Sequence, residues 1–388
     1  MTIESSKRKF IKDSILGISA VGCGVCHFES MANTLDALNV ETNSVAQHSP
    51  DGKFSIEAMY YVATPKGLKC LLCPNECKVK EGETSECRTR INNKGKLECI
   101  AYGNPCAVNV DPVEKKPLYH FLPSSKTLSI ATAGCNLACL NCQNWEISQT
   151  SPLKTRNFDL MPDQVVNKCL ESKCRSIAYT YSDPVAFYEY TLDTAKIAKQ
   201  ENIKNIIVSA GYIYEKPLRE WAKYIDGANI DLKSYSNEIY EMLNAGKLDP
   251  VLETLKILRE EGVWLEITNL IIPDWTDDSD MIKKMCDWLY DNDFKDTPIH
   301  FSRFFPLYKL TDLPPTPIDK LIQASTIAKN AGINFVYIGN APEIGKSITF
   351  CPKCNESIIE RNGFSVQKFN LMDGKCTNCA MAIPGIWE

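Results

Sequence analysis

The sequence predicts an α/β fold, a partial (β/α)6 barrel with small cysteine-rich metal-binding appendages on its N-terminal and C-terminal sides. Two observations carry this prediction. From about Thr127 onward, short apolar runs alternate with longer stretches of helical period, and a strand followed by a helix, repeated about six times, indicates a parallel sheet with right-handed crossovers. The 18 cysteines gather in tight groups, and their spacing is typical of metal ligands rather than disulfides.

The expected elements alternate along the second two-thirds of the chain. We expect strands at Leu128–Ala133, Ser176–Tyr181, Asn205–Ser209, Asn229–Leu232, Val263–Ile272, Ile299–Phe305 and Asn334–Ile338. We expect helices at Pro162–Ser172, Val185–Glu201, Lys216–Ile225, Asn237–Glu261, Asp278–Asp291 and Pro317–Ala331. The strand sequences indicate burial on both faces, as in a sheet covered by helices. About six units are fewer than the eight of a closed barrel, so the barrel is expected to be partial.

The chain is expected to divide into five parts. Residues 1–30 form a possible signal or N-terminal extension, and residues 31–55 form a polar, turn-rich linker. A cysteine-rich N-terminal domain at 56–122 precedes the partial barrel at 123–340, and a zinc-ribbon-like region at 341–388 follows it.

The composition is that of a soluble globular protein with a large core. Apolar residues make up 44% of the 388 residues and charged residues 23%, with a net charge of −5. Lysine and arginine are interleaved with acidic residues, and no basic stripe with interspersed aromatic residues occurs. Nucleic acid is therefore not an expected partner.

The first residues leave the localisation open. A charged stretch at Ser6–Lys12 precedes a short apolar run at Ile15–Val21, which is too short to span a membrane as a mature helix. This resembles a twin-arginine export signal with Lys7 in place of the first arginine, followed by a lipoprotein-like Cys23. The alternative is an N-terminal extension of a cytoplasmic protein. Both localisations, cytoplasmic or exported and membrane-anchored, stay open, as does cleavage of this segment.

The most informative motif lies at Gly134–Trp145, where Cys135, Cys139 and Cys142 form a C-x3-C-x2-C triplet. No fourth cysteine or histidine follows in the same loop, whereas a structural zinc site is normally closed by four ligands. A 4Fe–4S cluster held by three thiolates keeps one iron open for another ligand. The triplet directly follows the first barrel strand, and ligand sites in parallel α/β folds collect at the carboxyl ends of strands. The spacing therefore predicts an iron–sulfur cluster at the mouth of the barrel.

Two further groups of four cysteines have the spacing of metal ligands. The C-terminal quartet comprises Cys351, Cys354, Cys376 and Cys379. The N-terminal quartet comprises Cys70, Cys73, Cys77 and Cys87. The C-terminal spacing resembles a zinc ribbon, and we expect Zn²⁺ there. For the less regular N-terminal quartet we expect zinc, with an auxiliary iron–sulfur cluster as the alternative.

Several longer motifs accompany the triplet. They are C-x2-C-x3-C at Cys70–Cys77, D-P-V-E-K-K-P-L-Y-H-F at Asp111–Phe121, C-Q-N-W-E-I-S-Q at Cys142–Gln149, R-F-F-P-L-Y-K-L-T-D-L-P-P-T-P at Arg303–Pro317, Y-I-G-N-A-P at Tyr337–Pro342 and P-G-I-W at Pro384–Trp387. The triplet opening a partial barrel resembles the radical S-adenosylmethionine (radical SAM) superfamily. The whole set, over about residues 56–388, resembles the radical SAM component of the AmmeMemoRadiSam system, a group close to pyruvate formate-lyase activating enzymes.

The resemblance implies an oxidoreductase that cleaves SAM at the reduced 4Fe–4S cluster and abstracts hydrogen from a substrate through a 5′-deoxyadenosyl radical. It implies that the triplet ligates this cluster and that a low-potential donor such as flavodoxin or ferredoxin, and AmmeMemoRadiSam partner proteins, act with the chain. The substrate, a protein glycine or a small molecule, is not identified, and neither are the oligomeric state and the fate of SAM. The alternative is a zinc-stapled, non-catalytic scaffold or binding protein.

Four side chains are implied to contact SAM. Asp183, in T-Y-S-D-P, stands where relatives have a Glu-Pro element, and could also cap a helix before Pro184. Asp231 and Lys233 are similar to the D-L-K of activating enzymes, with a solvated strand end as the alternative. His300 resembles a histidine near SAM, although a lone histidine more often makes a local hydrogen bond.

Weaker candidates are Ser209 and Asn269 at other strand ends. One position departs from the superfamily pattern, because Asn141 occupies a site that is often aromatic and packs near the adenine. Trp145 could supply that ring, although a core position is the expectation.

Overall fold

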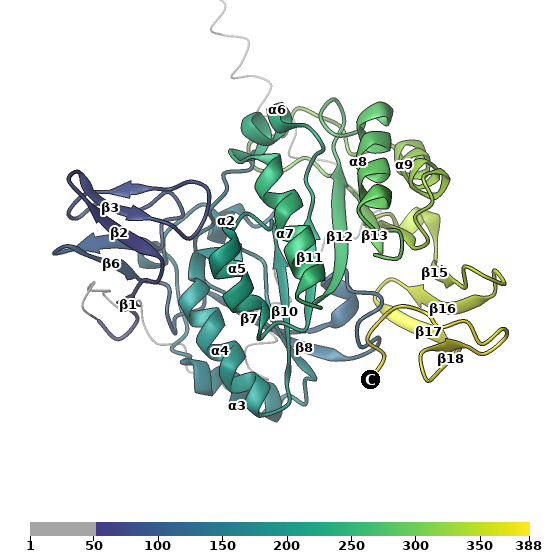
Figure 1. Ribbon diagram of the computed structural model, residues 1–388, viewed down its shortest axis with the longest axis horizontal. Helices are drawn as coiled ribbons and strands as arrows, with labels where there is room; N and C mark the ends of the chain where they lie inside the picture. Colours follow the sequence, from purple (N-terminus) through teal and green to yellow (C-terminus); the bar gives the residue numbers. More distant parts are fainter. Residues whose placement is uncertain (1–51) are drawn as a thin grey trace, which may run out of the picture. The chain divides into compact units, whose positions relative to one another are not determined.

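The computed structural model describes residues 52–388, which belong to the second of two compact units, residues 41–388. The possible signal with Cys23, and most of the expected linker, lie outside the described residues. Within these residues the centre is one sheet of eight strands (Figure 1). The strands are β7 (Ala107–Pro112), β8 (Lys126–Ala131), β9 (Ser176–Tyr179), β10 (Lys204–Ser209), β11 (Gly227–Asp231), β12 (Trp264–Ile271), β13 (Ile299–Arg303) and β14 (Val336–Gly339).

Strands β8 to β14 lie side by side in sequence order, and all neighbouring pairs among them are parallel. The predicted α/β fold is therefore confirmed, because repeated strand–helix units build a parallel sheet with crossovers. Strand β7 pairs antiparallel with β8 at one edge. It comes from the predicted N-terminal domain, so the barrel sheet begins at Ala107 rather than near residue 123.

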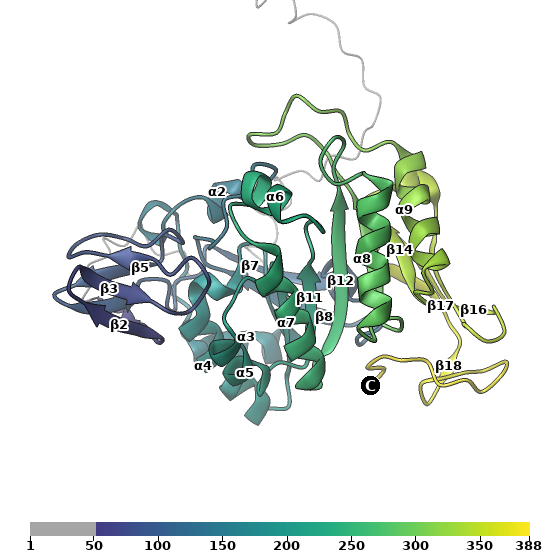
Figure 2. The same cartoon turned by 45° about the horizontal axis from the view of Figure 1, so that its top comes forward.

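Amphipathic helices cover the outer face of the parallel strands (Figure 2). They are α3 (Pro162–Glu171), α4 (Tyr188–Gln200), α5 (Glu215–Ala222), α7 (Leu248–Glu260), α8 (Ser279–Asp291) and α9 (Ile318–Asn330). Shorter helical segments are α2 (Trp145–Ser148), α6 (Asn237–Ile239), η2 (Val113–Lys115), η3 (Pro152–Lys154), η4 (Pro184–Phe187), η5 (Tyr240–Asn244) and η6 (Pro342–Ile344). No helix among the described residues is long and apolar enough to span a membrane.

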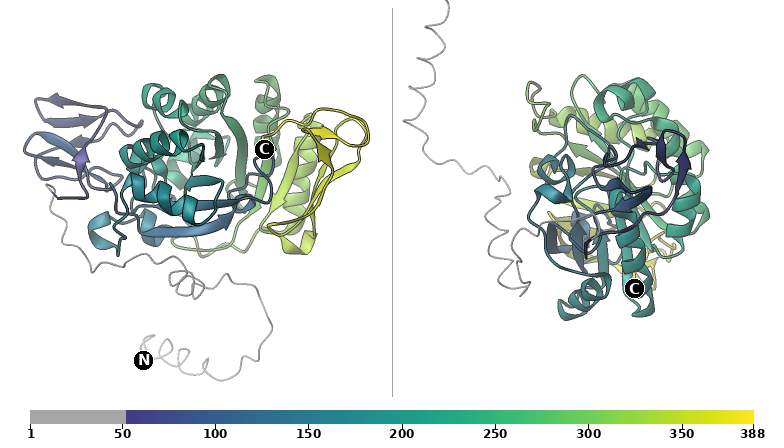
Figure 3. Two further views of the ribbon diagram at one scale, coloured as in Figure 1. Left: turned by 90° about the horizontal axis from the view of Figure 1, so that it is seen from below. Right: turned by 90° about the vertical axis from the view of Figure 1, so that its left-hand side faces the viewer.

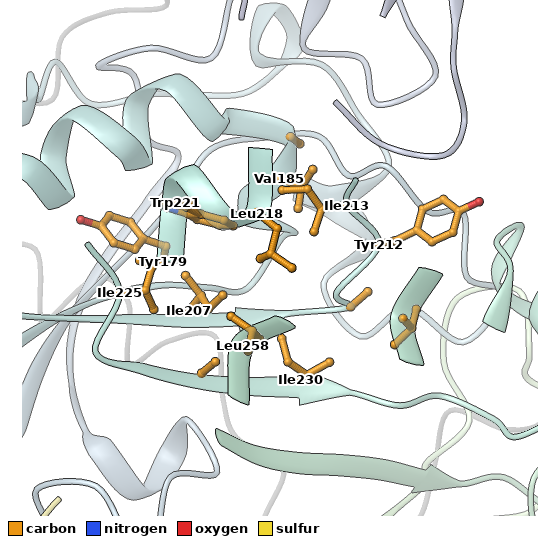
Figure 4. Packing of buried hydrophobic residues seen from close by; sticks show 14 of the residues in the cluster. Tyr179, Val185, Ile207, Tyr212, Ile213, Leu218, Trp221, Ile225, Ile230 and Leu258 are labelled. Atoms are coloured by element: carbon orange, nitrogen blue, oxygen red, sulfur yellow. The ribbon is translucent and has the colours of Figure 1, made fainter. Parts of the chain in front are cut away.

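The main core lies between the sheet and these helices. Figure 4 shows Ile207 of β10 and Ile230 of β11 facing Leu218 and Trp221 of α5 and Leu258 of α7. All five side chains are at most 1% exposed. Burial of each large apolar side chain contributes about 1.5–3 kcal/mol, so this layer fixes the strands that carry the site.

The expected helix Asn237–Glu261 is interrupted in the structure. Helix α6 continues into the π-helical turn η5, which ends at Ala245 with a left-handed backbone (φ 55°), and α7 starts afresh at Leu248. Gly246 packs closely on Leu137 in the break, since an added Cβ would lie 2.8 Å from a methyl carbon of that side chain. The interruption frees the last carbonyls of η5 for partners outside the helix.

The segment after β7 fills the amino end of the barrel. Its apolar side chains pack against the inward faces of β9 and β10, in a cluster formed by Val113, Leu118, Phe121, Leu122, Ala178 and Ile206. Phe121 also forms a bridge with Ile386 near the C-terminus. The motif Asp111–Phe121 therefore closes the amino end of the barrel, and the terminal P-G-I-W packs against this motif.

Two small β modules flank the barrel (Figure 3). The N-terminal one has the sheets β1 (Ile56–Glu57), β6 (Lys96–Cys99) and β5 (Arg90–Asn93), and β2 (Tyr61–Thr64), β3 (Gly67–Cys70) and β4 (Lys78–Val79). The C-terminal one has β15 (Ser347–Phe350), β16 (Ser357–Asn362) and β17 (Ser365–Phe369), with the hairpin β18 (Leu371–Met372) and β19 (Lys375–Cys376).

A buried polar network joins the barrel to its C-terminal module. His120 is fully buried, with Nδ1 2.8 Å from the Pro384 carbonyl and Nε2 2.7 Å from the Tyr337 hydroxyl. Its backbone N–H donates to Glu266 at 2.7 Å. Burial lowers the pKa of His120 to about 4, although the charge of Glu266 acts in the opposite direction. The ring is therefore neutral in the folded protein at neutral pH.

Because His120 is buried in its neutral form, we expect the folded protein to lose stability in mild acid. Between pH 6.5 and 4 the unfolded chain binds a proton at His120 that the folded chain does not bind. The free energy of unfolding should therefore fall by about 2 kcal/mol between pH 7 and pH 5. Urea unfolding of wild type and His120→Gln at both pH values tests this. The variant should lose about 2 kcal/mol less than wild type over this interval, and equal losses would contradict the assignment.

Candidate active site

The triplet loop leaves the carboxyl end of β8, where the sequence pattern predicted it. The free carbonyls of η5 hold this loop: Ala138 N–H donates to Asn244 O at 3.0 Å, and Leu140 N–H donates to Leu243 O at 2.9 Å. The broken helix therefore shapes the loop that carries the cysteines.

The three thiols have distinct surroundings. The Asn244 side-chain amide lies 3.2 Å from Cys139 Sγ, and the Leu137 N–H lies 3.4 Å from Cys135 Sγ. Burial raises the pKa of Cys135, and the neighbouring charges of Asp183 and Cys139 raise it further. Burial and Cys139 likewise raise the pKa of Cys142, whereas Lys233 lowers it. A bound metal would relieve this mutual repulsion, because it stabilises the thiolate forms.

Asp183 is buried at the carboxyl end of β9 and caps η4. Its carboxylate accepts hydrogen bonds from Val185 N–H at 3.0 Å, Ala210 N–H at 2.8 Å and the Ser209 hydroxyl at 3.1 Å. The predicted capping role is therefore confirmed. Burial raises the pKa of Asp183 despite these donors. Its charge acts on Cys135, and the contact with SAM stays a prediction.

Asp231 and Lys233 meet at the carboxyl end of β11. Lys233 Nζ lies 2.9 Å from Asp231 Oδ2, and both side chains are partly exposed. Burial lowers the pKa of Lys233, but Asp231 and then Cys139 outweigh this effect and raise it overall. The pair therefore presents one anion and one cation beside the triplet, as the alternation along the strand predicts.

His300 makes a local hydrogen bond in the structure, and its contact with SAM stays a prediction. It is the second residue of β13, and the strand register places it level with Thr268 of β12 and Asp231 of β11. Its Nε2 lies 2.7 Å from Glu266 Oε2, and its ring packs against Tyr119 and Tyr337. The local hydrogen bond given as its alternative role is the one observed.

Two features of the site differ from what the sequence indicated. Asn244 approaches Cys139 only because the helix breaks at Ala245. Trp145 is 37% exposed and stacks on Tyr308 at 5.2 Å, so its expected core position is wrong. The sequence did carry a signal for this stack, because the motif R-F-F-P-L-Y-K-L places the aromatic Tyr308 in the loop that follows β13.

The two cysteine quartets differ in geometry. In the C-terminal quartet, all four ligand atoms lie within 4.8 Å of one another, with Cys351 Sγ 3.6 Å from Cys379 Sγ and Cys354 Sγ 3.7 Å from Cys376 Sγ. This group can hold one metal ion. The N-terminal quartet surrounds a cavity beside the triplet loop.

Similar proteins place the chain in a family. The uncharacterized protein MJ0808 of Methanocaldococcus jannaschii is 40% identical over 316 residues, which cover 81% of this chain and 94% of that protein. The family model described as the radical SAM superfamily matches residues 129–289, which include the triplet. The chain belongs to the radical SAM superfamily. The pyruvate formate-lyase 1-activating enzyme of Escherichia coli is 24% identical over 41% of the chain and 66% of that enzyme.

Among solved structures, a domain of a pyruvate formate-lyase-activating enzyme from Bacteroides vulgatus is 16% identical, with a TM-score of 0.37, over 42% of this chain and 99% of that one. Membership in the radical SAM superfamily makes this protein an enzyme, with a 4Fe–4S cluster, SAM as substrate and a reductant as electron source. It supports SAM cleavage and radical chemistry, and gives the zinc-stapled scaffold no support.

The residues present fit this cofactor and substrate. Three thiols converge without a fourth ligand in their loop, which suits a cluster with one open iron. Three buried amide oxygens in or beside this loop have no hydrogen-bond donor among the described residues. They belong to Asn136, Asn141 and Asn244. Unpartnered acceptors at a partly negative site suit a ligand that brings an ammonium group.

Proposed function

We propose that this chain binds SAM at the triplet and abstracts a hydrogen atom from a protein glycine or a small molecule, in the manner of the AmmeMemoRadiSam radical SAM enzymes. The observation that carries the proposal is the convergence of Cys135, Cys139, Asp183 and Lys233 at one end of the sheet. A bound, reduced 4Fe–4S cluster supplies the electron that cleaves SAM to methionine and the 5′-deoxyadenosyl radical.

The chain's own residues bind and orient SAM in this proposal. Lys233 is placed to receive the carboxylate of the methionine moiety, and Asp183 to accept from its ammonium group. Asp231 holds the Lys233 ammonium at 2.9 Å, which limits the positions it can adopt. The exposed Trp145 stacks on the partly buried Tyr308 near the triplet loop, and this stack can take the adenine where Asn141 replaces the usual ring.

Anaerobic reconstitution tests the activity. Wild-type protein with dithionite and SAM should form 5′-deoxyadenosine and methionine in equal amounts, measured by liquid chromatography. Absence of both from protein that carries iron and sulfide would overturn the proposal. Addition of peptide or metabolite fractions from native cells should raise the rate when the substrate is present, and deuterium transfer into 5′-deoxyadenosine would identify the hydrogen donor.

Lys233→Met should raise the SAM concentration for half-maximal cleavage roughly 10-fold, because the ligand carboxylate loses its partner. Lys204→Met is the matched control: Lys204 pairs with Asp226 at the same 2.9 Å distance, but at the amino end of β10. This control should change the half-maximal concentration by less than about 2-fold. Equal effects of the two variants would contradict the role of Lys233.

We further propose Zn²⁺ in the C-terminal quartet. The pKa of Cys354 is lowered to about 6, and the largest cause is a hydrogen bond from the Asn378 side chain. A thiolate is therefore available near neutral pH. Sulfurs 3.6 and 3.7 Å apart match a tetrahedral ion with Zn–S bonds of about 2.3 Å. Cys376→Ala should remove about one zinc per chain in plasma emission analysis and leave the iron content unchanged. Loss of iron instead of zinc would contradict this assignment.

A further inference from the structure

A second thiol-lined cavity lies in the N-terminal module, beside the triplet loop. Four of its lining residues are Cys70, Cys73, Cys77 and Cys87, all of them free thiols. Three of these are buried and Cys77 is partly exposed. The turn between β3 and β4 supplies the first three, closed by the Cys70 N–H that donates to the Cys77 carbonyl at 3.0 Å. This wall is therefore a preformed set of four thiols.

The spacing of the sulfur atoms separates this site from a zinc site. Among residues 52–388, the C-terminal quartet is the one group of at least three Cys, His or acidic residues whose ligand atoms all lie within 4.8 Å of one another. The N-terminal quartet and the triplet both fail this test, so their sulfurs stand farther apart. A single ion draws its four ligands to one centre, whereas a 4Fe–4S cluster carries each thiolate on a separate iron. The wider spacing of these four thiols, all of which line one cavity, matches a cluster.

The wall of the cavity also suits a negatively charged cluster. Arg90 lines it and is 1% exposed; its terminal nitrogens bind Glu189, while its buried Nε has no hydrogen-bond partner among the described residues. The Ser85 hydroxyl lies 3.1 Å from Cys87 Sγ and can donate to it. Cationic groups and hydroxyl donors around ligand sulfurs stabilise the cluster and tune its potential.

The cavity and the triplet share one stretch of chain. Asn136 lines the cavity and directly follows Cys135. Its backbone carbonyl accepts a hydrogen bond of 2.7 Å from Asn75, another lining residue. Gly134 packs so closely on this module that an added Cβ would lie 2.6 Å from the Cys87 carbonyl oxygen. One residue of backbone therefore connects a ligand of the triplet to the wall of the second site.

We propose that Cys70, Cys73, Cys77 and Cys87 hold a second 4Fe–4S cluster that relays single electrons to the triplet. An external low-potential donor such as reduced flavodoxin gives one electron to the second cluster. That electron passes to the cluster of the triplet, and the second cluster returns to its oxidised state. The relay rests on the proposed function, whereas the presence of the second cluster does not.

The test uses the full-length chain with Cys135, Cys139 and Cys142 all replaced by Ala and then reconstituted anaerobically. This variant should keep about four iron and four sulfide per chain. After reduction it should give the electron paramagnetic resonance signal of a 4Fe–4S cluster, and SAM should leave that signal unchanged. A further Cys73→Ala change should remove both iron and signal. The matched control Cys99→Ala replaces a buried cysteine of the same module that does not line the cavity, and should keep both.

Wild-type protein gives an independent measurement if Cys73→Ala does not fold. Iron analysis should give about eight irons per chain, and Mössbauer spectroscopy should assign all of them to 4Fe–4S clusters. About four irons with two zincs in wild type, or zinc without iron in the triplet variant, would overturn the second cluster. These metal analyses do not depend on SAM cleavage, so failure of the proposed function is seen separately.

The relay has its own readout. Cys73→Ala in the otherwise intact chain should lower 5′-deoxyadenosine formation at least about 10-fold with reduced flavodoxin as donor. With dithionite, a small donor that can reach the triplet directly, the change should be under about 3-fold. Equal rates of wild type and variant with flavodoxin would overturn the relay and leave the second cluster in place.

Discussion

Cys139→Ala should reduce the formation of 5′-deoxyadenosine to below about 1% of the wild-type rate, because the radical SAM cluster loses one of three protein ligands. Cys139 is the triplet member whose sulfur is held by the Asn244 amide at 3.2 Å, and η5 fixes the neighbouring backbone. The loss should appear together with a decrease of about four iron per chain, measured after anaerobic reconstitution.

The matched control is Cys286→Ala, which removes a buried cysteine of α8 outside all three cysteine groups. It should keep the wild-type iron content and at least about half of the cleavage rate, since it costs only a small apolar contact. Wild-type activity in Cys139→Ala would show that the triplet is not the site of SAM cleavage.

Glu189→Gln should lower the free energy of unfolding by about 3–5 kcal/mol, the largest effect on stability that we expect. Glu189 and Arg90 form two hydrogen bonds of 2.9 Å, and their side chains are 3% and 1% exposed. The neutral amide leaves the Arg90 guanidinium buried without a counter-charge. Glu189 also accepts from the Met59 N–H at 2.7 Å, so this pair ties the N-terminal module to α4.

Asp287→Asn provides the comparison, since Asp287 pairs with Lys283 on the exposed face of α8 with side chains 43% and 65% exposed. This change should cost under about 1 kcal/mol because solvent screens the pair. Urea unfolding of both variants under reducing conditions measures the difference. A loss below about 1 kcal/mol in Glu189→Gln would mean that the buried arginine finds another partner.

The fold class could be predicted from the repeating pattern of strands and helices, because buried positions in each kind of element are apolar at a characteristic spacing. Buried parallel strands are apolar throughout, and covering helices are apolar at intervals of three to four residues. The triplet was equally visible, since its three ligands lie in one loop. Asp231 and Lys233 were found through their resemblance to the D-L-K of activating enzymes, and alternation along a strand places residues two apart on the same side.

The same patterns do not record which partner a buried polar side chain meets. His300 is on a barrel strand, as predicted, and its ring binds Glu266, a partner that the sequence pattern did not indicate. The break in the helix at Ala245 was also not predicted, because neither Ala245 nor Gly246 excludes a helix by itself. The left-handed Ala245 and the close packing of Gly246 on Leu137 are visible only in the tertiary structure.

The sequence by itself determined that this protein is a parallel α/β enzyme of the radical SAM type, with three groups of clustered cysteines. Only the tertiary structure decided which polar residues meet the triplet, and that two of the cysteine groups hold their sulfurs apart while the third draws them together. The reason is physical: local spacing sets which ligands can share a loop, whereas distances between sulfurs depend on how separate turns pack against the barrel.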